Sequence, residues 1–130
     1  MELDRLRAVR HIQKEIDDLE QLKHYLYYPV GSPRFDQVGH GSEPGDPTRR
    51  AVNAIAETED KICELQNRLA KEVSDILDWL YNEVEQSELR QILICHYLEG
   101  MPWEQTTRHV LGYVGTDSAR MRVYRFFGKV

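Results

Sequence analysis

The sequence predicts an all-α protein: a long antiparallel helical hairpin followed by a C-terminal unit of three short helices. Two long stretches place apolar residues at every third or fourth position, which is the spacing that lines one helical face. Shorter stretches near the C-terminus repeat this spacing. The glycines between these shorter stretches mark the points where helices end.

Residues 2–28 are expected to form the first helix, which ends before Pro29 because the residue preceding a proline is biased away from helical geometry. Its apolar face consists of Leu3, Leu6, Val9, Ile12, Ile16, Leu19, Leu22 and Leu26. Residues 29–47 hold four Gly and four Pro, which predicts a loop. The glycines of this loop lack the preceding strand and the spacing of a phosphate-binding loop.

A second helix is expected from Pro47 to about Glu85, because Asp46 is a favoured N-cap and proline suits the first helical position. Its apolar repeat consists of Val52, Ile55, Ile62, Leu69, Val73, Ile76, Leu80 and Val84. This repeat fits a coiled coil whose partner is either the first helix, folded back, or a second copy of the chain. The first helix is too short to cover residues 73–84. Either the C-terminal unit or another subunit must therefore pack there.

A third helix is expected over residues 88–99. Ser87 is predicted to cap it and Gly100 to stop it, since glycine adopts the left-handed conformation easily. The face that this helix buries is expected to hold Leu89, Ile92, Leu93, His96 and Tyr97. In this position His96 is expected to be a hydrogen-bonded core residue rather than a metal ligand.

Two shorter helices follow, and Gly112 ends the first of them. That helix carries, at helical spacing, Trp103, Thr107, Val110 and Leu111. After a turn at residues 113–115, either Thr116 or Asp117 is expected to cap a last helix that ends at about Phe127. The apolar face of the last helix is predicted to hold Ala119, Val123, Phe126 and Phe127.

Two short helices joined by a glycine turn, the second of them basic, form the outline of a helix-turn-helix. In that motif the second helix enters the major groove of DNA. Arginine suits this task because its planar fork can pair with guanine or hold a phosphate. The predicted DNA-contacting residues are Thr116, Ser118, Arg120, Met121, Arg122 and Arg125. The competing interpretation is an ordinary helical corner with a solvated basic face.

The charge of the chain is unevenly distributed. The net charge is −5, and residues 1–86 contain 11 Lys and Arg against 18 Asp and Glu. Residues 87–130 contain six basic against four acidic residues. This asymmetry favours the C-terminal part as the end that faces nucleic acid, although the surplus is small.

The sequence offers no catalytic or metal-binding pattern. The five histidines are scattered at positions 11, 24, 40, 96 and 109, without His-Glu-x-x-His or Cys-x-x-Cys spacing. We therefore expect neither an enzyme nor a cofactor or metal. Cys63 and Cys95 lie in apolar helical stretches and are expected to be buried, reduced thiols. The N-terminus has no uninterrupted apolar segment, and no run approaches the ~20 residues of a membrane span, so a cytoplasmic location is expected.

Residues 89–127 resemble the fourth region of bacterial sigma factors, and more closely the phage late-transcription regulators of the ArpU and RinA type. The likeness is carried by LRQILICHYLEGMPWEQ, LGY and DSARMRVYRFF. It includes a helix ending in an aromatic, an aliphatic and a glycine before a Trp-Glu pair. Thr106 and Thr107 depart from the large aliphatic and alanine usual after that pair, so their hydroxyls need hydrogen-bond partners such as helix carbonyls. The VGTDS turn is also longer than usual.

The resemblance implies transcription regulation of phage or prophage genes by binding double-stranded DNA, and it allows contact with RNA polymerase. On this hypothesis residues 1–86 form the hairpin, which dimerises or meets another protein, and residues 87–130 form the DNA-binding domain. Two alternatives remain open at this point. One is a small terminase subunit that packages DNA as a ring. The other is an interaction module that binds polymerase without touching DNA.

Overall fold

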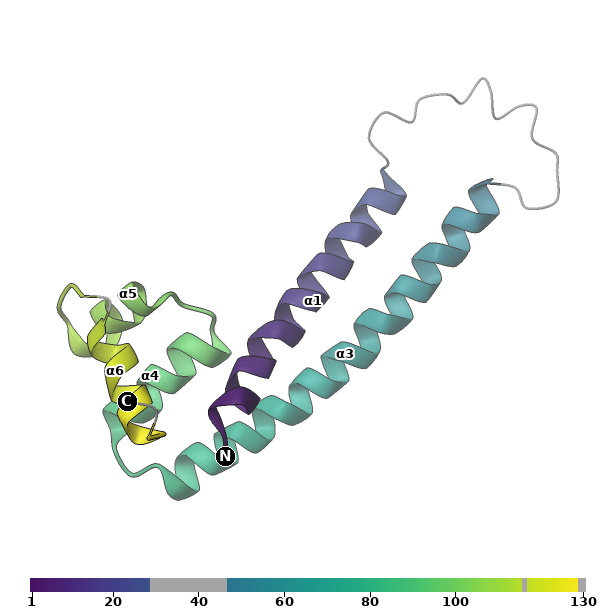
Figure 1. The fold of residues 1–130 in the computed structure, drawn as a ribbon. Helices are drawn as coiled ribbons and strands as arrows, with labels where there is room; N and C mark the ends of the chain where they lie inside the picture. Colours follow the sequence, from purple (N-terminus) through teal and green to yellow (C-terminus); the bar gives the residue numbers. More distant parts are fainter. Residues whose placement is uncertain (29–46, 116, 129–130) are drawn as a thin grey trace. The chain divides into compact units, whose positions relative to one another are not determined.

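The computed structural model describes residues 1–28, 47–115 and 117–128, and every regular element in these ranges is helical (Figure 1). The elements are α1 (Leu3–Tyr27), α3 (Pro47–Glu83), α4 (Ser87–Leu93), α5 (Trp103–Thr106) and α6 (Asp117–Phe126). Two π-helical turns, η1 (Ile94–Leu98) and η2 (Thr107–Leu111), continue α4 and α5. The all-α prediction is therefore confirmed for the described part of the chain. The predicted Asp46 cap and most of the predicted loop lie outside it.

The chain divides into two compact units: residues 1–13 together with 69–130, and residues 14–68. The first unit contains one continuous apolar cluster. Its buried members are Leu3, Leu6, Val9, Ile76, Leu80, Val84, Leu89, Ile92, Leu93, Tyr97, Ala119 and Val123. The sequence left open what covers residues 73–84. The cluster shows that the start of α1 and the C-terminal helices of the same chain do so.

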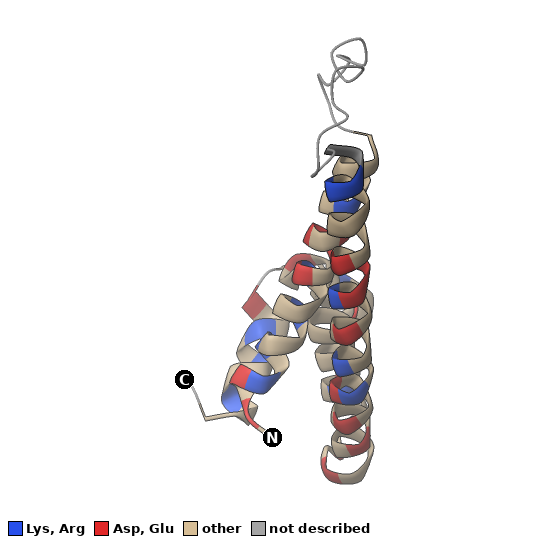
Figure 2. Cartoon of the chain, turned by 90° about the vertical axis from the view of Figure 1, so that its right-hand side faces the viewer, with Lys and Arg blue, Asp and Glu red and all other residues tan. Residues whose placement is uncertain are grey.

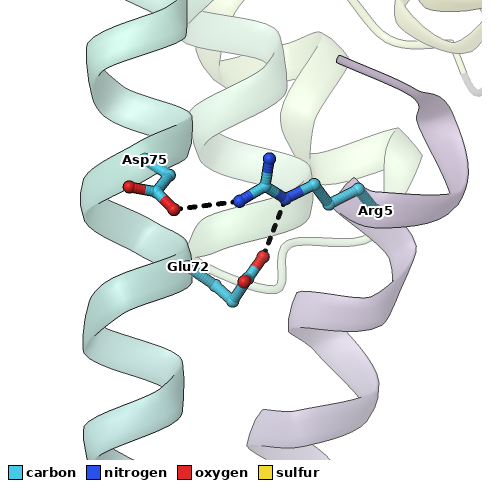
Figure 3. Close-up of polar contacts among 3 residues, drawn as sticks. All are labelled: Arg5, Glu72 and Asp75. Carbon is cyan, nitrogen blue, oxygen red and sulfur yellow. Dashed lines mark hydrogen bonds and ion pairs between the residues drawn. The ribbon is translucent and has the colours of Figure 1, made fainter.

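A polar contact also joins the start of α1 to the last turns of α3 (Figure 3). Arg5 Nε lies 2.9 Å from Glu72 Oε2, and Arg5 Nη2 lies 2.9 Å from Asp75 Oδ2. The two carboxylates stand one helical turn apart, so the planar guanidinium can reach both. The hydrogen bond with Glu72 raises the pKa of Arg5. The pair is solvent-exposed, so it orients the two helices more than it stabilises them.

The end of α3 is capped by a side chain from α4. Arg90 Nη1 donates hydrogen bonds to the carbonyl oxygens of Val84, at 2.7 Å, and Glu85, at 2.9 Å. Terminal carbonyls of a helix lack intrahelical partners, so this arginine satisfies groups that would otherwise need water. Its guanidinium carbon also lies 5.3 Å from the centre of the Tyr81 ring. Arg90 thus fixes where α4 starts.

The prediction that Ser87 caps the third helix is wrong. Gln86, in extended conformation, occupies the cap position and makes no side-chain capping bond. Ser87 is already the first helical residue, and its hydroxyl accepts a hydrogen bond from Gln91 Nε2 at 3.3 Å. A side chain at that position cannot reach the free amides as an N-cap side chain does.

The second unit is built from residues 14–27 of α1 and 47–68 of α3, and Ile16 and Ile62 are its buried aliphatic residues. Cys63 is exposed, so the expectation of two buried thiols is correct for Cys95 and wrong for Cys63. Cys63 follows the buried Ile62, and one residue turns a helix by about 100°, which carries its side chain off the inner face.

Charged residues cover the outer helical surfaces. Figure 2 shows acidic and basic residues following one another along α3, the long helix in front in that view. Among the helices that the structure describes, none is both long and apolar enough to serve as a membrane span.

Candidate nucleic-acid interface

The candidate site is the C-terminal group of helices within the first unit, where α4, α5 and α6 gather together (Figure 1). As predicted, Leu89, Ile92 and Leu93 of α4 are buried. Cys95 and Tyr97 of η1 are buried as well, and burial raises the pKa of both groups, that of Tyr97 to about 12. α4 and its continuation η1 form the inner support on which α5, η2 and α6 pack.

His96 holds the turn that leads into α5. Its Nδ1 lies 2.6 Å from the carbonyl oxygen of Met101, and its ring stacks on Trp103 with centroids 3.5 Å apart. A carbonyl can only accept, so Nδ1 carries the proton and Nε2 is free to accept from Arg10 Nη1 at 3.1 Å. Burial lowers the pKa of His96 to about 4, which keeps the ring neutral at pH 7. The prediction of a hydrogen-bonded core histidine is confirmed.

Thr106 and Thr107 are both fully buried. The Thr107 hydroxyl donates to the carbonyl oxygen of Trp103 at 2.9 Å, and the Thr106 hydroxyl donates to that of Met101 at 3.5 Å. The predicted requirement for hydrogen-bond partners is therefore met by backbone carbonyls. The two threonines occupy core positions without leaving a buried hydroxyl unpaired.

The turn between η2 and α6 begins at Gly112, which has a φ of 82°. Its N–H donates to the carbonyl oxygens of Thr107 and Arg108, so it closes η2 in the left-handed conformation that glycine adopts without strain. Asp117 is the first residue of α6, so it lies inside the helix and not at its cap. Thr116, the other predicted cap, lies outside the described residues.

The inward face of α6 is largely as predicted. Ala119 and Val123 are completely buried in the apolar cluster. Phe127 is half-buried and stacks on Trp79, with ring centroids 6.1 Å apart. Phe126 meets the same tryptophan edge-on but leaves 45% of its surface exposed, so the expectation that it faces fully inward is wrong. Phe126 is the last residue of α6.

Arg120 and Arg122 do not share one side of α6. Side chains two residues apart on a helix are rotated by about 200° from each other, so these two arginines lie on opposite flanks. Arg120 Nη2 lies 2.7 Å from Asp117 Oδ1, and its Nε is enclosed without a hydrogen-bond partner. Arg122 Nη1 lies 2.9 Å from Glu88 Oε1 of α4. Both arginines are thus held by acidic residues of the same unit.

Met121 and Arg125 are one helical turn apart and share the side of α6 opposite Ala119 and Val123. Met121 and Ser118 are half-buried, and Arg125 is exposed. Arg125 also borders an open cavity of about 640 Å³, beside the last turn of α3. The residues lining it are Glu83, Val84, Glu85, Gln86, Leu89, Arg122, Arg125 and Phe126. Five of the six predicted contact residues are described: Ser118, Met121 and Arg125 form an outer row, with Arg120 and Arg122 at its flanks, and Thr116 lies outside the described residues.

The residues that α1 brings to this unit could not be predicted from the sequence. Arg7 Nη2 lies 3.5 Å from the hydroxyl oxygen of Tyr124, on α6. These residues are 117 positions apart. A pattern confined to one helix contains no signal for such a contact.

In the described part of the chain, no group of three or more His, Cys, Asp or Glu side chains is arranged to hold a metal ion. The sequence matches no protein-family model, and neither a curated protein nor a solved structure shows significant similarity to the chain.

Proposed function

We propose that this chain binds double-stranded DNA through α6, with α5 and η2 as the bracing helix of a helix-turn-helix. The observation that carries the proposal is the division of α6 into two faces. Ala119 and Val123 fix one face in the core, while the half-buried Met121 and the exposed Arg125 lie on the opposite face. A short helix anchored on one side and open on the other can enter a major groove without disturbing its own support.

The open side has the chemistry that duplex DNA requires. Arg125 can pair with guanine or with a phosphate, and Met121 offers an apolar contact to a thymine methyl group. Arg120 and Arg122 are held in surface ion pairs, which typically contribute about 0–1 kcal/mol. A phosphate can displace such a carboxylate partner at little cost. The two flanking arginines are therefore available to the DNA backbone.

We further propose that the chain regulates transcription in a phage or a prophage-bearing bacterium, as its likeness to regulators of the ArpU and RinA type implies. In this proposal α1 and α3 form a helical hairpin that dimerises in the cytoplasm, and the protein acts by binding rather than by catalysis. Pairing matters because one helix-turn-helix makes few contacts, and two linked half-sites bind far more tightly than one. RNA polymerase is a second partner in the same proposal.

Selection of bound fragments from a random duplex pool, followed by gel-shift titration, tests DNA binding. We expect a consensus, and we expect the triple change of Arg120, Arg122 and Arg125 to Ala to abolish its binding. The matched control changes the exposed Arg49, Arg50 and Arg68 of α3 to Ala, which removes the same charge from the other unit. If the α6 variant binds as tightly as the control, the assignment of α6 is wrong.

A protein-interaction module is the second candidate, and the acidic surroundings of the site favour it. Glu83 and Glu85 line the same cavity as Arg125, and Glu88 pairs with Arg122. These carboxylates oppose a phosphate backbone but not a protein partner. Failure of the selection to enrich any fragment, together with capture of purified RNA polymerase, would establish this alternative. A solution mass of eight or more copies would indicate a terminase-like ring instead.

A further inference from the structure

A second basic element lies beside α6. The start of α1 belongs to the same compact unit, and Arg7 reaches the Tyr124 hydroxyl from it. The guanidinium carbon of Arg120 lies 5.9 Å from the centre of the ring of the same tyrosine. Tyr124 is therefore approached by two arginines that are far apart in sequence.

The position of α1 at this place is fixed by the core. Leu3, Leu6 and Val9 are buried in the apolar cluster, which leaves Arg7 on the outer side with 48% of its side chain exposed. One turn further along α1, Arg10 donates to the neutral His96 ring. The Arg7 guanidinium is thus presented from a helix whose inner face is anchored in the core.

Each of the two arginines has a nearby carboxylate three residues before it on its own helix. Arg7 Nη1 lies 3.6 Å from Asp4 Oδ1, and Arg120 pairs with Asp117. The side chains of Asp4 and Asp117 are 86% and 71% exposed, so water screens both pairs. The pairs hold the guanidiniums in place but do not block their exchange to a stronger anion.

We infer that Arg7, Tyr124 and Arg120 form a phosphate-contacting flank that holds the backbone of a duplex whose groove is read by α6. This inference rests on the proposed function and adds α1 to the DNA-binding surface. Arginine and tyrosine side chains both donate to phosphate oxygens. Because these residues lie on the flank of α6 and not on its outer row, their contact carries no sequence preference.

The test measures the affinity of the full chain for a mixed-sequence duplex over a series of salt concentrations. Replacement Arg7→Gln is expected to weaken binding several-fold and to reduce the slope of log affinity against log salt by about 1, because one phosphate contact is lost. Replacement Asp4→Asn is expected to strengthen binding, because it removes a competing carboxylate. The matched control is Arg68→Gln on α3, which removes one charge from the other unit and should change neither quantity.

The opposite signs of the two effects separate a DNA contact from a loss of folding, because damage to the fold cannot strengthen binding. Arg7→Lys keeps the charge and should retain the wild-type salt slope. If the wild type binds but Arg7→Gln and Asp4→Asn both match it, the flank is overturned and the proposed function stands. If the wild type binds no duplex at low salt, the proposed function fails and this inference fails with it.

Discussion

The two compact units use the same helices in different ways. In the first unit, the start of α1 and the last turns of α3 meet the C-terminal helices, and together they bury one extended apolar cluster. In the second unit, the remaining stretches of α1 and α3 bury Ile16 and Ile62. A helix has one apolar stripe, so two helices alone can enclose little, whereas a third layer encloses side chains completely. We therefore expect most of the stability of the protein to come from the unit that carries the candidate interface.

The largest expected effect compares one core residue from each unit. Leu80 is fully buried in the apolar cluster, so Leu80→Ala should lower the free energy of unfolding by about 2–5 kcal/mol. Ile62→Ala in the second unit should cost less, because neighbouring side chains there can close over the gap or meet water. Urea denaturation followed by circular dichroism measures both. Equal losses would show that the units are equally well packed.

The free energy of unfolding is expected to depend on pH through His96, which lies in the first unit. The pKa of His96 is about 4 in the folded chain, below its ordinary value of 6.5. Between these values the unfolded chain binds more protons, so stability is full above pH 6.5 and falls as the pH drops toward 4. The loss amounts to about 3 kcal/mol at most.

The readout for this prediction is unfolding at a series of pH values for the wild type and for His96→Gln. The variant should show a flatter profile between pH 6.5 and 4. The protection of backbone amides in residues 50–65, which belong to the second unit, should be the same in the wild type and in His96→Gln when it is measured by hydrogen exchange. Identical profiles for the two proteins would mean that His96 titrates normally in the folded chain.

Arg90 is expected to have a smaller effect. Arg90→Ala removes the hydrogen bonds to Val84 and Glu85 and uncovers the end of α3, at a cost of about 1–2 kcal/mol. The control is Arg49→Ala at the exposed start of α3, in the second unit. The melting temperatures of both variants, measured by thermal unfolding, test this prediction. A melting temperature unchanged by Arg90→Ala would show that water caps α3 equally well.

Arg5 should have the smallest effect, although its ion pairs are the most visible polar link between α1 and α3 (Figure 3). Both ion pairs are partly exposed to solvent, which screens them. Arg5→Ala should shift the melting temperature less than any variant above, and the shift should disappear at 1 M salt. A large shift that persists in salt would mean that polar contacts, rather than the apolar cluster, hold α1 in the first unit.

Much of the local structure follows from sequence patterns. The three-four repeat predicts α1 and α3 to within a residue or two, and the stops at Gly100 and Gly112 follow from the conformation that glycine allows. Met101 and Trp103, whose carbonyl oxygens accept from His96 and Thr107, are near in sequence, so these two hydrogen bonds could also be anticipated. These features depend on contacts within one helix or one turn.

What the sequence did not reveal depends on how separate helices pack. Arg122 pairs with Glu88 of α4, which is 34 residues away in sequence. The approach of Arg7 to Tyr124 requires α1 to reach the C-terminal helices. Periodicity gives the faces of each helix but not which helix each face will meet. The phosphate-contacting flank of Arg7, Tyr124 and Arg120 could therefore be recognised only from the three-dimensional structure.

The most direct test of the central claim is photo-crosslinking from a single reactive side chain to a labelled duplex. A photoreactive residue placed at Met121, on the open side of α6, should give a covalent DNA adduct that free duplex competes away. The same residue at Glu57, exposed in the second unit, should give none. An adduct from position 57 but not from position 121, or no adduct from either under conditions where DNA is bound, would contradict the proposal.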